Sequence, residues 1–258
     1  MLKYKVFVIN LARSPQRLEA ISAQLQKFGI NFERIEAVDG NTYSAEQIEA
    51  VSPQALVNKS YYRDLGKGEV GCSLSHKRAW QKVIDDELDF AFILEDDITL
   101  EANFGDVIEL FESLPHNDWE YVKLYPMKRG SGKNIRHSFP YKGHEFVTYH
   151  KLPLSTAAQV VSYKGAQRLL KNMPYVLEPI DGQLKSWWTL DIYPMGLTPY
   201  CVSVAADVGS EINPNGGLER MKQRKLTKLL LNWTRAFKRM IAMPSLDKHF
   251  NQFKNSLK

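Results

Sequence analysis

The sequence has few cysteines and no long apolar run. Its 258 residues include only Cys72 and Cys201, which stand far apart and form no CxxC pair. We therefore expect neither a disulfide framework nor a structural zinc site, and a reducing compartment suits the chain. The N-terminal apolar run, 6–9, is too short for a signal peptide core, and no stretch approaches the ~20 apolar residues of a membrane span. These absences predict a cytoplasmic protein that does not cross a membrane.

The sequence also lacks the P-loop pattern GxxxxGK[ST], internal repeats and low-complexity segments. Its composition, 44% hydrophobic and 24% charged, is that of an ordinary globular protein. The length allows one large domain or two small ones.

Charge is unevenly placed along the chain. Residues 218–258 contain eleven Lys or Arg and two acids, a net of +9, whereas the whole chain carries +5. Residues 1–217 therefore carry −4. We expect a mildly acidic main domain over 1–217 and a basic tail over 218–258.

Local patterns in the first forty residues indicate an α/β fold. A β-rich run at 5–10 predicts a strand, and Ser14 followed by Pro15 predicts a helix start. A second strand within 30–40 ends at the turn signal Asp39-Gly40. Strand, helix and strand in this order favour parallel pairing. Further strands are expected in the 90s and at 121–127, a helix with a loop at 41–67, and an irregular loop at 128–146.

Three adjacent carboxylates end the apolar run FAFIL. Glu95, Asp96 and Asp97 follow residues 90–94 directly, and in open α/β sheets ligands bind at the carboxyl ends of strands. Clustered oxygen ligands there suit Mg²⁺ or Mn²⁺, completed by substrate phosphates. The alternative is a solvated acidic turn. Because the preceding run buries the strand and fixes its end, the pattern favours a metal site.

Positive side chains follow the first strand. Arg13 and Arg17 lie near the start of the first helix, where the N-terminus favours anions. They are equally compatible with two surface arginines on an exposed helix.

Three other segments carry side chains that could take part in catalysis or in ligand binding. Ser75 and His76 follow a glycine-rich turn and fit a ligand-contacting helix start better than a nucleophile pair, although a lone histidine is more often structural. Asp181, before Gly182, could serve as a general base or could simply form a turn. Asp207 could be a late metal ligand or a helix cap.

Taken in order, VINLARSPQR, IEAVDG, GEVGCSLSHKRAW, FILEDDI, STAAQVVSYKGAQRLL and PIDGQL resemble glycosyltransferase family 25, over residues 3–210. The resemblance implies a GT-A-like nucleotide-sugar-binding fold with a mostly parallel sheet, a UDP-sugar donor, Mn²⁺ (or Mg²⁺) and inversion at the anomeric carbon. Asp97 is then the first choice as metal ligand, with Glu95 beside it, and Asp181 is the expected base. The nucleotide side would be formed by Asn10, Leu11, Arg13, Arg17 and Asp96, with Ser75 and His76 nearby.

The expected reaction is transfer of galactose or glucose from UDP-galactose or UDP-glucose to a terminal sugar of lipid-linked lipooligosaccharide. Two rivals compete with it. A metal-dependent nucleotide-sugar hydrolase or nucleotidyltransferase also needs clustered acids. A nucleic-acid binder could use the basic tail, but an acidic body and charge confined to one helix are against it.

The tail predicts a basic amphipathic helix. Its apolar residues fall on one helical stripe, with Lys and Arg on the other faces: Leu226, Leu229, Leu230, Trp233, Phe237, Met240 and Ile241. Such a helix could lie on the anionic inner face of a membrane or could pack on the enzyme body. The sequence leaves both open.

Overall fold

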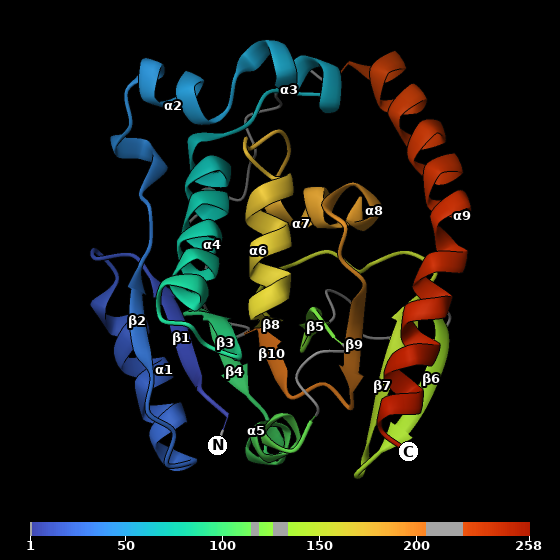
Figure 1. Cartoon of the computed structure of the whole chain (residues 1–258). Helices are drawn as coiled ribbons and strands as arrows, with labels where there is room; N and C mark the ends of the chain where they lie inside the picture. The colour runs from blue at the N-terminus through green and yellow to red at the C-terminus, as the bar shows by residue number, and fades with distance from the viewer. Residues whose placement is uncertain (1, 115–118, 126–133, 205–223) are drawn as a thin grey trace.

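The computed structural model describes residues 2–114, 119–125, 134–204 and 224–258. An eight-stranded sheet forms its centre, in the order β2-β1-β3-β8-β5-β9-β7-β6 (Figure 1). Its strands are β1 (Tyr4–Asn10), β2 (Glu33–Glu36), β3 (Phe90–Glu95), β5 (Tyr121–Lys123), β6 (Ile135–Tyr141), β7 (His144–Tyr149), β8 (Ala158–Ser162) and β9 (Pro194–Thr198). A separate antiparallel pair joins β4 (Ile98–Leu100) to β10 (Val202–Val204).

The sheet is mixed, so the prediction of a mostly parallel sheet is wrong. β1 pairs in parallel with β2 and β3, and β5 pairs in parallel with β9. The other four pairings, β3·β8, β5·β8, β7·β9 and β6·β7, are antiparallel. The strand, helix, strand pattern of the first forty residues correctly predicted the parallel pair of β1 and β2. The later strands do not alternate with helices in this way, so the pattern could not be extended to them.

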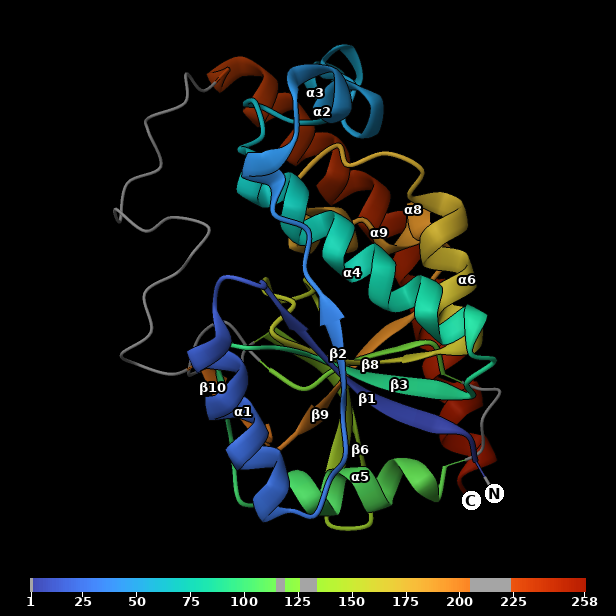
Figure 2. The ribbon, with the colours of Figure 1, turned by 90° about the vertical axis from the view of Figure 1, so that its left-hand side faces the viewer.

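Helices cover both faces of the sheet (Figure 2). One face holds α1 (Pro15–Lys27) and α5 (Phe104–Glu112), and the other holds α4 (Lys67–Asp85) and α6 (Tyr163–Asn172). Along β1, Val6 and Val8 join the core on the first side, while Phe7 and Ile9 join the core on the second. A strand buried on both faces needs apolar residues at every position, which explains the unbroken runs in β1 and β3.

Two segments differ from their sequence prediction. The expected loop at 128–146 contains, in its described part, the hairpin of β6 and β7. Residues 41–67 form the short helix η1 (Gly40–Thr42) and two helices, α2 (Ala45–Val51) and α3 (Gln54–Ser60), rather than one. Two further short helices, α7 (Ile180–Leu184) and α8 (Trp187–Leu190), follow α6.

The chain brings several segments to one edge of the sheet. The parallel strands β1, β2 and β3 end there, and β5 ends there too because it runs antiparallel to β8, which is itself antiparallel to β3. The segment entering β8 also lies at this edge, where Glu95 N donates to the Ala157 carbonyl over 2.8 Å. Ligands bind at such edges in open α/β sheets.

The basic tail forms α9 (Lys225–Ser256), with Pro244 inside it. Beyond residue 242 the helix packs on the body through Met243, Leu246, Phe250 and Phe253, all buried. Among the described residues, no helix is both long enough and apolar enough to cross a membrane.

Candidate active site

A cleft at this edge collects most of the residues that the sequence singled out. It lies between the ends of β1 and β3, the turn after β2, and the first half of α4. Its lining includes Leu11, Arg13, Arg17, Asp39, Gly40, Asn41, Gly68, Cys72, Ser75, His76, Glu95, Asp96 and Asp97. Asp207 belongs to residues 205–223, outside the described part of the chain.

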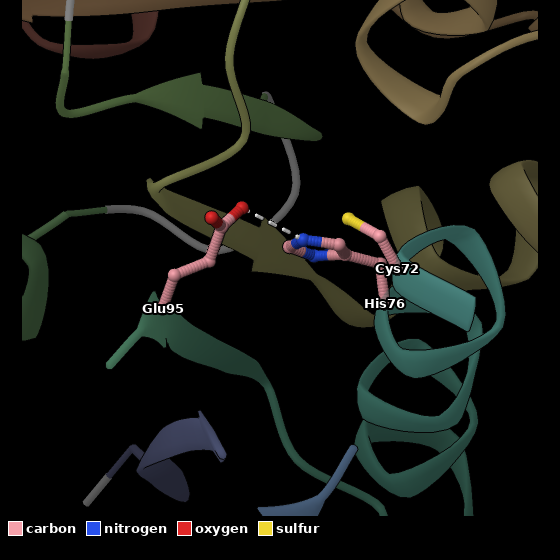
Figure 3. Close-up of side chains that lie close together, drawn as sticks. All are labelled: Cys72, His76 and Glu95. Atoms are coloured by element: carbon pink, nitrogen blue, oxygen red, sulfur yellow. Dashed lines mark hydrogen bonds and ion pairs between the residues drawn. The ribbon is translucent and has the colours of Figure 1, made fainter. Parts of the chain in front are cut away.

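Glu95 is held in a fixed direction at the end of β3. Its Oε1 accepts a hydrogen bond from the Thr156 hydroxyl at 2.7 Å. The same oxygen lies 3.1 Å from Nε2 of His76 (Figure 3). Nδ1 of His76 lies 2.9 Å from the side-chain amide nitrogen of Gln159, which can only donate, so Nε2 carries the proton toward Glu95. Burial raises the pKa of Glu95, but His76, Thr156 and Lys123 outweigh it and lower the pKa overall. Glu95 therefore stays ionised.

Asp96 links the ends of β1 and β3. Asn10 donates to its Oδ2 at 2.6 Å, and the Arg17 guanidinium lies 3.4 Å from Oδ1. Asn10 itself is buried and also donates to the Ser14 carbonyl. These contacts occupy both carboxylate oxygens of Asp96. Asp96 therefore positions Asn10 and Arg17, two of the residues predicted for the nucleotide side.

Asp97 carries negative charge that its surroundings do not balance. Burial, followed by the charges of Glu95 and Asp96, raises its pKa to about 6, and Arg17 lowers it only in part. A divalent cation at this point would supply the missing positive charge, and carboxylate oxygens are the ligands that Mg²⁺ and Mn²⁺ prefer. The residues at the end of β3 therefore fit the predicted metal.

A second donor set, which shares Glu95 with the first, lies in the same cleft. Cys72, His76 and Glu95 place one ligand atom each within 4.8 Å of one another (Figure 3). Cys72 and His76 are one turn apart on α4, a spacing present in the sequence but not recognised from it. Burial, with Glu95 and other acids, raises the pKa of the Cys72 thiol well above its usual value. Because a thiol must ionise to bind metal, this set suits a hard cation poorly.

The glycine motif 66–71 serves a close backbone approach. GKGEVG has the GxGxxG spacing of dinucleotide-binding turns, but it begins α4 after α3 and follows no strand. A Cβ on Gly71 would lie 2.5 Å from the Val38 carbonyl and 2.7 Å from Gly40 N. The Ser75 hydroxyl joins the same two segments, because it accepts from Val38 N at 2.8 Å and donates to the Gly71 carbonyl at 2.7 Å. The motif thus fixes the turn after β2 against α4.

On the opposite wall, the segment between β1 and α1 faces the cleft. Leu11 contributes apolar surface there, and Arg13 forms an ion pair with Asp39. This pair ties the start of α1 to the turn after β2. The two arginines therefore stand across the cleft mouth from α4.

Asp181 lies outside the lining of the cleft but is joined to it. Its Oδ2 accepts a hydrogen bond from the Ser155 backbone N–H at 3.1 Å, and the next residue, Thr156, bonds to Glu95. Ser155 has φ of +75°, which side-chain-bearing residues rarely adopt. The buried Lys123 donates to the Ser155 carbonyl. Segment 155–156 thus connects the predicted base to the predicted metal site.

Sequence comparison agrees with these motifs. The family model described as glycosyltransferase family 25 (LPS biosynthesis protein) matches residues 3–183, well over half of the chain. The chain belongs to glycosyltransferase family 25. The prediction of the family is therefore confirmed.

Three similar members of family 25 come from animals. Procollagen galactosyltransferase 2 of Homo sapiens is 30% identical over 187 residues, covering 69% of this chain and 29% of that protein. Procollagen galactosyltransferase 1 of Danio rerio is 32% identical over 184 residues, with coverage of 69% and 30%. The probable inactive glycosyltransferase 25 family member 3 of Bos taurus is 30% identical over 174 residues, with coverage of 66% and 29%. The chain thus spans less than a third of the length of these relatives.

Two solved structures are distantly similar. A glycosyltransferase involved in the glycosylation of the major capsid of PBCV-1 is 11% identical, with a TM-score of 0.33 and coverage of 64% and 62%. Mouse xyloside xylosyltransferase 1 is 13% identical, with a TM-score of 0.34 and coverage of 73% and 76%.

Three residues of this family 25 site were missed by the sequence analysis. Thr156 and Gln159 orient Glu95 and His76, and Lys123 lies buried near both Glu95 and Asp181. Burial lowers the pKa of Lys123 to about 8, although Asp181 and Glu95 favour its charged form. One signal for Lys123 was present, since a lysine interrupts the otherwise apolar strand YVKL.

Proposed function

We propose that the protein is an inverting, metal-dependent hexosyltransferase that moves galactose from a UDP-sugar to a glycan hydroxyl. One observation carries the proposal. In a member of family 25, a single cleft at the carboxyl ends of parallel strands places two arginines on one wall and three carboxylates at its end. Such a cleft can hold a diphosphate between the two arginines on one side and a metal ion on the carboxylates on the other.

The nucleotide would bind against the start of α1. Arg17 lies in the first turn of this helix, whose N-terminus favours phosphate, and Arg13 precedes it. Asn10 and Asp96 hold Arg17 and the ends of β1 and β3 at fixed positions. Leu11 would pack on the nucleotide, while Ser75 and His76 would support the wall behind it.

Asp97 and Glu95 would hold the metal ion. A Mn²⁺ or Mg²⁺ ion bound there would neutralise charge on the departing diphosphate. His76 and Thr156 contribute by fixing the direction of Glu95 before the ion binds. Orienting partners of this kind support the metal affinity of a site.

Asp181 would take the proton from the acceptor hydroxyl. The Ser155 N–H holds Oδ2, which leaves Oδ1 to receive the proton when the hydroxyl attacks the anomeric carbon. The new glycosidic bond forms on the face opposite the breaking carbon–phosphate oxygen bond, and the electron pair leaves with the diphosphate. A single displacement of this kind inverts the anomeric centre.

Donor and acceptor follow from what the relatives are named. Two of them are galactosyltransferases, which favours UDP-galactose over UDP-glucose. The family description refers to LPS biosynthesis, which favours a terminal sugar of a lipid-linked oligosaccharide as acceptor. As part of this proposal, residues 1–217 form a GT-A-like glycosyltransferase domain.

A metal-dependent nucleotide-sugar hydrolase or nucleotidyltransferase is the alternative. The same acids and arginines would serve hydrolysis or nucleotidyl transfer. Because one relative is named as probably inactive, family membership alone does not establish sugar transfer. The two functions differ in their need for an acceptor.

UDP release from a panel of UDP-sugars tests the proposal. It should be measured with Mn²⁺ or with EDTA, and with or without a lactose- or glucose-terminated acceptor. Release from UDP-galactose that needs both metal and acceptor would support the transferase. Equal release without acceptor would support the hydrolase. No release, together with no thermal shift by UDP and Mn²⁺, would overturn the proposal.

A further inference from the structure

The first half of α9 exposes an apolar face. Among the described residues, nine large hydrophobic side chains are strongly exposed, and seven of these lie on this helix, each 54–72% exposed. They are Leu226, Leu229, Leu230, Trp233, Phe237, Met240 and Ile241. At ~100° per residue they fall on one side of the helix and span roughly 22 Å along it. We call this set the α9 stripe.

The opposite side of the same helix segment is fixed to the body. Arg235 donates to the Ser60 carbonyl and to Glu178, both at 2.7 Å. Arg224 donates to the Tyr61 carbonyl at 3.0 Å, and Lys228 lies 4.6 Å from the centre of the Tyr62 ring. The helix therefore lies beside α3 (Figures 1 and 2). These contacts set its orientation, and the stripe, on the other side of the helix, is exposed.

The stripe is not unused core surface. The apolar residues that α9 gives to the core, Leu246, Phe250 and Phe253, lie on the other side of the helix and are each at most 3% exposed. Exposed apolar patches of this extent mark contact sites with a membrane or a protein.

The charge around the stripe favours a membrane over a protein as its partner. Residues 224–246 contain Arg224, Lys225, Lys228, Arg235, Lys238 and Arg239, and no acid. Arg224, Lys228 and Arg235 are held on the body, whereas Lys225 and Lys238 are exposed. We propose that the α9 stripe lies in the headgroup region of an anionic lipid bilayer, with Lys225 and Lys238 on lipid phosphates. A second copy is disfavoured, because a symmetric contact would bring two acid-free basic segments together.

This inference rests on α9 alone and does not depend on the proposed reaction. It bears on that reaction through Glu178, which pairs with Arg235 and lies three residues before Asp181. Docking of the stripe would hold the end of the body that carries α7 close to the bilayer. A lipid-linked acceptor would then be presented at the membrane surface.

Vesicle co-sedimentation of the full chain tests the proposal. The lipids are phosphatidylcholine alone and phosphatidylcholine with added phosphatidylglycerol. We expect binding only to the anionic vesicles, weakened by salt. Trp233→Glu with Phe237→Glu should weaken it by more than about tenfold. Lys225→Glu with Lys238→Glu should also weaken it by about tenfold or more, because each cation near the surface contributes to binding.

A matched variant controls for net charge. Lys27 and Lys171 are exposed lysines on α1 and α6, and Lys27→Glu with Lys171→Glu should bind as the unchanged protein does. Circular dichroism and the melting temperature should stay constant, since the stripe residues are exposed. Absence of binding to anionic vesicles, or equal loss in the control, would overturn the proposal. So would a concentration-dependent dimer in light scattering that Trp233→Glu with Phe237→Glu dissociates.

Discussion

The backbone N–H of Ser155 donates a hydrogen bond to Oδ2 of Asp181 over 3.1 Å. Ser155 is held at a positive φ, and its carbonyl accepts from the buried Lys123. Backbone strain of this kind persists where the surroundings enforce it and often marks a functional site. The contact gives Asp181 a fixed position although its own helix, α7, has only five residues.

Asp97→Ala and Asp181→Ala should both abolish sugar transfer but should differ in nucleotide binding. Asp97 would hold the metal, so its loss should remove Mn²⁺-dependent UDP binding. Asp181 would act only on the acceptor hydroxyl, so its loss should leave that binding intact while kcat falls by about 10²-fold or more. Calorimetric titration of UDP with Mn²⁺, combined with the UDP-release assay, measures both.

The exposed Asp85 on α4 provides the control, since Asp85→Ala should change neither property. Near-full turnover by Asp181→Ala would show that another group is the base.

Cys72→Ala should keep the Mn²⁺ dependence of UDP release within about a factor of three, because a hard cation prefers the carboxylates to a buried thiol. His76→Ala should raise the Mn²⁺ concentration needed by about 10–100-fold, since it releases Glu95. Titration of Mn²⁺ into each variant measures the difference. If Mn²⁺ no longer activated UDP release by Cys72→Ala, the metal site would be the set of Cys72, His76 and Glu95.

Gly71→Ala should destabilise the protein by about 1–3 kcal/mol, because its Cβ would meet backbone atoms of Val38 and Gly40. Gly105→Ala on α5 is the matched control. Its Cβ would come no closer than 3.4 Å to Phe28, and alanine favours helix by up to ~1 kcal/mol. Denaturant unfolding measures both, and equal effects would contradict the proposed packing of the turn on α4.

Glu178→Gln should change how stability depends on pH. Burial raises the pKa of Glu178 from 4.5 to about 7, and Arg235 opposes the rise only in part. The folded protein therefore holds this proton more tightly than the unfolded chain does, and stability falls as pH rises between about 4.5 and 7. Glutamine mimics the protonated form, so the variant should match the parent near pH 4.5 and exceed it by roughly 2–3 kcal/mol at pH 8.

Unfolding measured across this pH range tests the Glu178 prediction, with Glu109→Gln, an exposed acid on α5, as control. A variant that is less stable than the parent at pH 8 would mean that the ion pair with Arg235 outweighs the cost of burial.

Local sequence patterns predicted the elements whose causes are local. Pro15 at the first helical position and Gly29 at positive φ bracket α1 as expected. The apolar run 90–94 became a buried strand that ends at Glu95. The hairpin of β6 and β7 was missed because its exposed strand, 135–141, is polar and contains Pro140, features typical of loops.

The sequence by itself determined the family, through motifs whose order and spacing can be read directly, and it determined which acids end a buried strand. Only the tertiary structure decided how those acids differ. Asp96 is compensated by Asn10 and Arg17, whereas Asp97 is not, because strand pairing places β1 beside one carboxylate and leaves the next in the cleft. Likewise, helical periodicity predicted an apolar stripe on α9, but only packing decided that this stripe is exposed while Met243, Leu246, Phe250 and Phe253, on the other side of the helix, are buried against the body.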